Sequence, residues 1–530
     1  ILIVLSTVSG SDYSTSVLTN TTANEESRPY NGEGNSKLVA SRGARETPYT
    51  RVDSGVNAPS GYVGAAVADW VKRLEAKNIS SRLLSNIVSA QPAKVQQECA
   101  VGACFNSFYT TFAQFCYLDM THSTGSSEKW NLPIPKDGLL DRAGTQTSSF
   151  TRSKYEGGST DVRKQINSNT HFLDGEAVYG YNDAYATAIR AGTGGLLKTS
   201  KWGGVAQYSE AIHATLSGAG SPGMANACPR ADKSELYLSG SRRMNSLPQL
   251  VVVHTLFLRE HNRRAGRLAK AHSDWTDEQL YQKARTWVVA LIQAIFYEEY
   301  LPLLLNKKLP AYDKYDSTID PAVDIFAGTV AMRYGHSEIP SVYGGNGAPV
   351  LRDSWFHPQD YVHSNESFVN ILTAMLESKQ EAIDPYVVDD VRQYTFSCDG
   401  QPRKDLAMSN IQRGRDNGLP SYNEARRMYG LLPYSSISDM KATDEVKNRL
   451  TTAYGEDGVN DIDPWLGALS EEITGPSSVG PLITAALKKQ FTRTRDGDRF
   501  WYENMMSPAE IKEVKHYKMS DVIANNAGQQ

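Results

Sequence analysis

The chain has 530 residues, with 55 Lys and Arg against 59 Asp and Glu and a formal net charge of −4. There is no basic block to indicate a nucleic-acid partner and no acidic tail to indicate a solvating arm. No stretch reaches the roughly 18 consecutive apolar residues that a membrane-spanning helix needs. Five cysteines in a chain of this length are too few for a disulfide scaffold.

The first 36 residues are predicted to be an N-terminal arm or signal remnant, and residues 37–530 a single large domain. Ile1–Leu5 is an apolar run typical of the end of a signal-peptide core. Residues 6–36 are rich in Ser, Thr, Asn and Gly, so we expect them to be flexible. An apolar, extended segment followed by a polar, flexible one suits binding in a groove on a neighbouring molecule. This arrangement predicts a homo-oligomer or filament. The alternative is an uncleaved signal remnant.

Hydrophobic spacing predicts a mainly α fold. Helices are expected over residues 64–90, 105–120, 247–270, 278–305 and 321–332. Pro302 is expected to end the fourth of these because it lacks a backbone donor. Residues 121–165 are punctuated by Gly, Ser and Pro and are expected to be loop. No internal repeat and no alternating β pattern appears.

Six segments carry most of the residues suited to chemistry. In chain order they are Gln114-Phe115-Cys116-Tyr117-Leu118-Asp119, the run 170–180, the run 243–262, Arg333-Tyr334-Gly335-His336, the run 410–420 and the run 495–504. Together they resemble the animal-type haem peroxidases of the peroxidase–cyclooxygenase superfamily. The similarity is greatest to the peroxinectin and dual-oxidase branch. The resemblance implies one large helical domain with few short strands.

The resemblance implies that His336 is the axial ligand of a haem. A b-type haem needs one strong donor, which neutral imidazole supplies. Asn410 matches the residue that fixes the ligand tautomer, and Arg333 matches one placed near a propionate. Gln114 matches a residue on the cofactor side of the distal helix. On spacing alone, His336 would more often be a satisfied core histidine, so the motif carries this hypothesis.

The distal side departs from the family pattern, Gln-Phe-x-Asp-His-Asp. Leu118 stands where the catalytic histidine is expected, although Arg243 matches the distal arginine. Peroxide cleavage needs a base to move a proton and a cation to stabilise developing charge, and Leu118 cannot be that base. His122 lies about one helical turn further on and would need the chain to shift before it could substitute.

The family's covalent haem attachments are also missing. Tyr117 and Ser246 occupy the two positions that carry ester-forming acids in the family, so any haem b is expected to be non-covalent.

The residues of the family's calcium loop are better retained in this sequence. The family's ligands map onto five oxygen donors, those of Asp119, Thr170, Phe172 (backbone carbonyl), Asp174 and Glu176, which suit Ca²⁺. The alternative is a solvated acidic loop.

Three Asn-x-Ser/Thr sequons occur, at Asn20, Asn78 and Asn365. Such triplets also arise by chance, but with this family they favour a glycosylated extracellular protein. Cys99 and Cys104 are spaced to close a small ring, whereas Cys116 falls inside a helix and is expected to be a buried thiol.

Three functions remain open from the sequence. The favoured one is a secreted, haem-binding peroxidase relative with impaired H₂O₂-dependent activity, used as a structural component of an extracellular assembly. The second is an active peroxidase that oxidises a donor through Arg243 with water or His122. The third is a haem-free scaffold, which would show no Soret absorbance.

Overall fold

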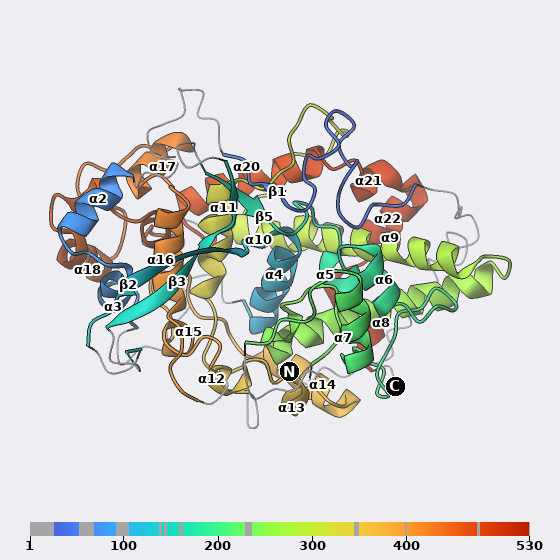
Figure 1. The fold of residues 1–530 in the computed structure, drawn as a ribbon. Helices are drawn as coiled ribbons and strands as arrows, with labels where there is room; N and C mark the ends of the chain where they lie inside the picture. The colour runs from blue at the N-terminus through green and yellow to red at the C-terminus, as the bar shows by residue number, and fades with distance from the viewer. Residues whose placement is uncertain are drawn as a thin grey trace.

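A computed structural model describes residues 26–51, 68–91, 105–136, 140–141, 146–157, 163–227, 236–343, 349–397, 400–473 and 477–528. The ring expected between Cys99 and Cys104, the sequon at Asn20 and the first 25 residues of the arm lie outside these ranges. Within them helices dominate and strands are few and short, which confirms the mainly α prediction (Figure 1).

The helices and strands follow one another along the chain in a largely α order. They are β1(Thr47–Pro48), α2(Asp69–Ala76), α3(Ser81–Ile87), α4(Ser107–Met120), β2(Gly125–Pro133), β3(Thr147–Ser153), β4(Tyr155–Glu156), β5(Lys164–Asn167), α5(Glu176–Tyr179), α6(Asp183–Ile189), α7(Glu210–Gly218), η2(Met244–Ser246), α8(Pro248–Ala271), α9(Asp277–Ile295), η3(Phe296–Tyr300), α10(Leu301–Leu305), α11(Ile325–Thr329), η4(Ala331–His336), α12(Leu351–Ser354), α13(Pro358–Tyr361), α14(Asn365–Glu377), α15(Asp389–Arg392), α16(Leu406–Asp416), α17(Tyr422–Met428), α18(Asp444–Tyr454), η5(Gly458–Asn460), α19(Pro464–Leu469), α20(Pro481–Asp496), α21(Tyr502–Met505), α22(Pro508–His516) and α23(Met519–Asn526).

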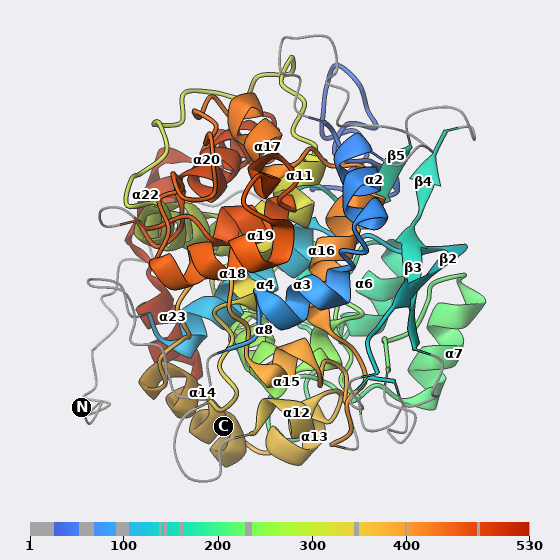
Figure 2. The same ribbon diagram turned by 90° about the vertical axis from the view of Figure 1, so that its left-hand side faces the viewer.

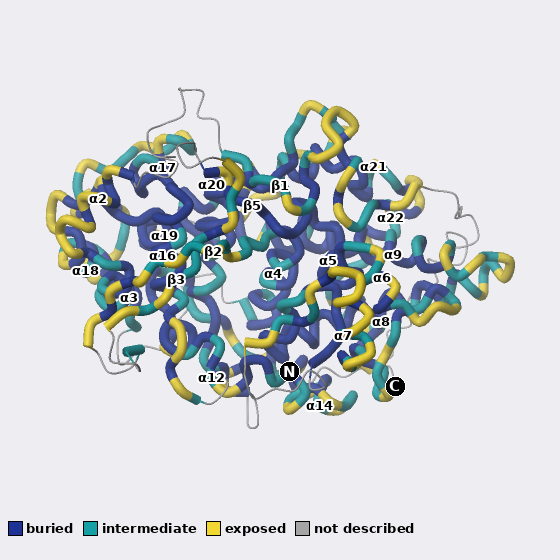
Figure 3. The backbone as a smooth tube through the Cα atoms, viewed as in Figure 1, coloured by how far each residue is buried: buried dark blue, intermediate teal, exposed yellow. Residues whose placement is uncertain are grey.

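Helix α4 runs through the middle of the molecule (Figure 1). Asn106 caps its N-terminus by accepting from the Tyr109 N–H, a favourable arrangement for an Asn at this position. Its apolar residues pack against α8, where the Phe115 and Phe257 rings stack with centroids 5.4 Å apart. Most of the helix is buried, so it is fixed from several sides (Figure 3).

Helices α8 and α9 form the long antiparallel pair that supports α4. Pro248 opens α8 at a position where its missing N–H costs nothing. Thr276 and Gln279 form a capping box that opens α9. A rotated view places this pair behind the helices of the C-terminal half (Figure 2).

The helix that contains Pro302 does not end there, contrary to the sequence prediction. Helix α9 continues through η3, a π-helical turn, into α10, where Pro302 occupies the first turn. A proline within a helix cannot donate to the carbonyl four residues earlier. The wider π turn just before it changes the hydrogen-bond ladder and lets the helix run on.

The segment Asp277–Leu305 is long and apolar enough to cross a membrane by length and composition alone. In the fold, 78% of its most apolar stretch is buried inside the protein. The core of the domain therefore accounts for its apolar character, as it does for many buried helices.

Strands were underpredicted in residues 121–165. Strands β2 and β3 pair antiparallel with Trp130 opposite Phe150, and β1, β5 and β4 form a small antiparallel sheet. Most side chains of the β2–β3 hairpin are polar and part-exposed, and only a few, such as Leu132 and Phe150, pack on Met408 of α16. Too few apolar positions alternate for the sequence to signal these strands.

Two further local predictions differ from the structure. Residues 26–36, which composition placed in the arm, pack on the domain: Asn35 is fully buried and donates to Asp498 at 2.8 Å, and Arg28 pairs with the same carboxylate at 2.6 Å. The helix expected over 321–332 is shorter, with only α11 before the 3₁₀ turn η4. Asp324 begins α11 because its carboxylate accepts from two N–H groups of the first turn.

Candidate functional site

A cavity of about 390 Å³ lies between the distal helix α4 and the turn η4. This volume is within the range of small-molecule and cofactor sites. Gln114 and Leu118 point into it from α4, one helical turn apart, and are the part-exposed positions of an otherwise buried stretch. His336 and Arg333 line it from η4. The structure therefore brings the proximal and distal candidates around one space.

His336 is held as a neutral ligand would need to be. The Asn410 amide nitrogen lies 2.8 Å from His336 Nδ1, and the amide oxygen accepts from Arg333 at 3.3 Å. Ligation through Nε2 needs the exchanged orientation of the amide, in which Nδ1–H donates to the amide oxygen and Nε2 keeps its lone pair. Burial and the neighbouring Arg333 guanidinium lower the pKa of His336 to about 3. The imidazole is therefore neutral near pH 7, the form that binds iron.

Cationic side chains surround the cavity. Arg243, Arg333 and Lys404 all line it, and among the described residues Glu338 is its only acidic lining residue. Burial lowers the pKa of Arg333 to about 10 and that of Lys404 to about 8. These groups suit a ligand that carries carboxylates.

Arg243 also fixes the end of the distal helix. Its Nη2 donates to the carbonyl oxygens of Leu118 at 3.0 Å and Thr121 at 2.7 Å. A cation at this end satisfies carbonyls that the helix leaves unpaired and interacts favourably with its dipole. Arg243 lies in the 3₁₀ approach to α8, so it couples the position of Leu118 to that helix.

His122 reaches the same cavity by an unexpected route. Helix α4 ends at Met120, and the extended backbone of Thr121 turns the chain so that His122 lines the cavity without any shift of the chain. Burial and the nearby charges of Arg243, Arg242 and Arg45 hold the pKa of His122 well below its usual value. The ring is therefore a poor proton acceptor at neutral pH.

Glu338 is a cavity residue that sequence reasoning missed. It is fully buried, with the side chains of Thr110 and Gln380 as its polar neighbours. Burial raises the pKa of Glu338 to about 8. The sequence gives no signal for it beyond its place two residues after His336.

Tyr117 and Ser246 occupy the positions where the family carries ester-forming acids. Both are buried, and Tyr117 lines the cavity.

The expected calcium ligands are gathered in one buried region. The Asp119 carboxylate accepts from the N–H groups of Asp174, Gly175 and Ala177 at 2.6–2.9 Å. Thr170 Oγ1 donates to Asp174, and the Phe172 side chain is fully buried beside them.

Electrostatics in this loop is unfavourable without a cation. Burial and the neighbouring carboxylates raise the pKa of Asp119 and of Glu176 to about 8. Arg45 pairs with Glu176 at 3.1 Å, and the charges of Arg28 and Arg285 act on Asp174, but burial still raises the pKa of all three acids. The donors fit a hard cation by type and charge. Within the described ranges, however, no three His, Cys, Asp or Glu side chains converge on one metal position.

The two described sequons differ. Asn78 is exposed in a turn with φ of 55°. Asn365 begins α14, and its Oδ1 accepts from the buried Arg259 at 2.9 Å. Cys116 is buried and free, as expected for a thiol inside α4.

Comparison with known proteins decides the family. The sequence pattern of the animal haem peroxidases matches residues 27–530. The chain belongs to the animal haem peroxidase family. Peroxinectin A of Dictyostelium discoideum is 32% identical over 96% of this chain and 94% of its own length. The dual oxidase of Drosophila melanogaster is 33% identical over 74% of this chain, which spans 27% of that longer protein.

Solved structures agree with this placement. Peroxidase A from Dictyostelium discoideum superposes with a TM-score of 0.81 at 29% identity, covering 95% of this chain and 98% of its own. Fatty acid α-dioxygenase from Arabidopsis thaliana has a TM-score of 0.74 at 19% identity, over 94% of this chain and 80% of its own, which shows the shared fold alone. Members of this family bind haem, and the cavity between α4 and η4 gathers residues whose chemistry fits that group.

Proposed function

We propose that this chain is a secreted, haem-binding peroxidase relative with impaired H₂O₂-dependent activity. The observation that carries the proposal is Leu118, a hydrocarbon side chain on the cavity wall that α4 forms, while His336 lines the same cavity from η4. A hydrocarbon cannot accept the proton of the peroxide. Loss of one positioned base typically costs ~10²–10⁴-fold in rate, so a low residual turnover is expected.

We expect the other cavity residues to have the roles that the family resemblance assigns to them. Haem, when bound, would supply the redox-active iron. His336 would offer Nε2 as a ligand, and Asn410 holds the ring orientation. Arg333 and Lys404 would pair with haem carboxylates, and Arg243 would stabilise negative charge on a peroxide oxygen. Tyr117 and Ser246 cannot form an ester, so acid–butanone extraction should remove the haem.

Leu118→His tests the proposal directly. Stopped-flow absorbance should show the first peroxide-dependent step accelerating by ~10²–10⁴-fold over wild type. Leu118→Met keeps the size and the apolar character, so it is the matched control and should remain slow. A wild-type rate already equal to that of Leu118→His would overturn the proposal.

The second candidate is an active peroxidase that uses His122. The observation in its favour is that His122 lines the cavity beside Arg243. His122→Gln separates the two functions: it should leave the low wild-type rate nearly unchanged if Leu118 limits the reaction. A loss of about 10²-fold or more would identify His122 as the working base. A purified protein without a Soret band would instead support the haem-free scaffold.

Calcium and secretion belong to the same proposal. Three neighbouring buried acids support a Ca²⁺ ion held by Asp119, Asp174 and Glu176, with oxygens of Thr170 and Phe172. Metal analysis after gentle purification should find calcium.

Expression through a secretory pathway should yield soluble, glycosylated protein. The role in an extracellular assembly is tested by deleting residues 1–8: light scattering should then show a smaller particle.

A further inference from the structure

A second cavity of about 300 Å³ lies next to the π-helical turn η3. Within the part of the chain that the structure describes, the two cavities share no lining residue. Its walls include three aromatic rings, those of Tyr297, Tyr312 and Trp501, and its rim includes the exposed Ala311. Nothing in the proposed haem chemistry uses this space.

The polar groups of the second cavity are largely paired. Lys308 forms an ion pair with Glu298 at 3.1 Å, and Lys515 pairs with Glu503. The Tyr312 hydroxyl, in contrast, is buried without a hydrogen-bond partner. Paired charges leave little net attraction for an ion, whereas the aromatic walls suit a neutral aromatic molecule.

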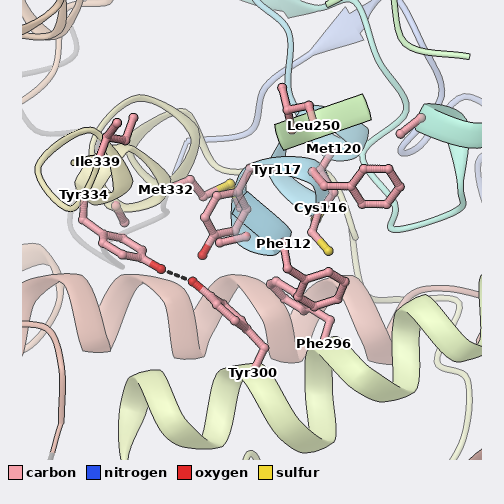
Figure 4. Close-up of a cluster of buried hydrophobic side chains, with 14 of the residues drawn as sticks. Phe112, Cys116, Tyr117, Met120, Leu250, Phe296, Tyr300, Met332, Tyr334 and Ile339 are labelled. Carbon is pink, nitrogen blue, oxygen red and sulfur yellow. Dashed lines mark hydrogen bonds between the residues drawn. The ribbon is translucent and has the colours of Figure 1, made fainter. Parts of the chain in front are cut away.

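A continuous chain of aromatic rings connects the two cavities. Tyr117 lines the first cavity, and its ring lies 6.0 Å from that of Phe296 and 6.3 Å from that of Phe491. Figure 4 shows Tyr117 and Phe296 in the same buried cluster. Phe296 and Phe491 lie 5.8 and 5.9 Å from the ring of Tyr297.

The chain then reaches the second cavity. The Tyr297 and Trp501 rings are 4.7 Å apart, and Trp501 lies 6.1 Å from Tyr312. Tyr297 and Trp501 are 5% and 2% exposed, and Phe296 and Phe491 are fully buried. Buried, closely spaced rings allow an electron to tunnel between oxidisable tyrosine and tryptophan side chains, and the two phenylalanines bridge without being oxidised themselves.

We propose that the second cavity binds a phenolic electron donor, whose electron passes through Trp501, Tyr297 and Tyr117 to the first cavity. This inference rests on the peroxidase chemistry proposed above. Each phenol loses one electron and its hydroxyl proton and becomes a phenoxyl radical, and the proton leaves to water at the open rim. Two electrons and two protons reduce one hydrogen peroxide to two waters.

Binding is tested without haem or peroxide. The probe is 2,6-dimethoxyphenol, followed by saturation-transfer NMR on the purified chain. Ala311→Trp fills the cavity from its exposed rim and should abolish the signal. Trp130→Phe, which changes a tryptophan on β2 outside the cavity, should leave it unchanged. Equal binding by wild type and Ala311→Trp would overturn the site.

Electron transfer is tested in the Leu118→His background, where the peroxide step is not expected to limit the rate. Iodide is small enough to enter the first cavity directly, so it serves as the reference donor. Trp501→Phe should lower the ratio of phenol oxidation to iodide oxidation several-fold, and Trp130→Phe should not. Peptide mass spectrometry after peroxide alone should find oxidation at Trp501, which the phenol suppresses.

The outcomes separate this inference from the proposed function. Absence of a Soret band would refute the haem proposal, while the NMR experiment would still decide the donor site. An unchanged phenol-to-iodide ratio in Trp501→Phe, with a normal Soret band and normal peroxide consumption, would refute the electron route alone.

Discussion

His261 should make the native state acid-sensitive over a defined pH window. It is fully buried on α8 between Tyr179 and Gly195. Its Nε2–H donates to the Gly195 carbonyl at 2.8 Å, so Nδ1 accepts from the Tyr179 hydroxyl at 2.9 Å. Both nitrogens are satisfied in the neutral ring. Burial lowers the pKa of His261 to about 4.

The sign and size of this pH effect on the free energy of unfolding follow from proton linkage. In the unfolded chain a histidine binds its proton near pH 6.5, whereas the folded chain does not until about pH 4. The stability from neutral His261 is therefore fully present above pH 6.5 and is lost as the pH falls towards 4. At about 1.4 kcal/mol per pKa unit, the loss is about 3 kcal/mol. A typical domain has only ~5–15 kcal/mol of stability in total.

Urea unfolding between about pH 7 and about pH 4 measures this contribution. The difference in unfolding free energy between wild type and His261→Gln should be largest near pH 7 and shrink by about 3 kcal/mol at pH 4. His363→Gln, at an exposed position, is the matched control. A wild-type-minus-variant difference that does not change with pH would refute the reasoning.

Three further outcomes are expected. Asp463→Asn should lower the unfolding free energy by ~3–5 kcal/mol in urea titrations, because it leaves the buried Arg415, now held by two 2.8 Å contacts, without its charge partner. A chelator should lower the unfolding free energy by about 3 kcal/mol relative to Ca²⁺ at ~100 times its Kd, and Glu176→Gln should reduce that difference. Glycopeptide mapping of secreted protein should find Asn78 occupied and Asn365 largely unmodified, because Arg259 holds the Asn365 amide.

The residues expected to bind haem could be picked out from the sequence because they lie in short motifs, and their role in binding stays a prediction. The turn with His336 and the helix with Leu118 were each recognisable alone, and the fold brings them to one cavity. The geometry of His122 was predicted wrongly, because helical spacing was carried on past residue 120, where the expected helix and α4 both end.

Other features arise only from tertiary contacts. Glu338 carries no motif, and its burial in the cavity wall depends on what the fold packs around it. The second cavity joins Tyr297 to Trp501, side chains about two hundred residues apart in the chain. Periodicity reports which face of an element is buried, but it does not report which distant ring will meet that face.

The π-helical turn has a consequence for insertions and deletions. A π turn amounts to one extra residue accommodated within an α-helix. Deleting a residue at this turn would restore a regular ladder and leave the later side chains on nearly the same faces. A deletion in the regular part of α9 would instead rotate all later side chains by roughly 100° about the helix axis. At the π turn the cost of a deletion falls on Pro302, which would meet a regular α-helical turn. A single-residue deletion there should thus act through Pro302 and not by turning the later side chains away from their partners.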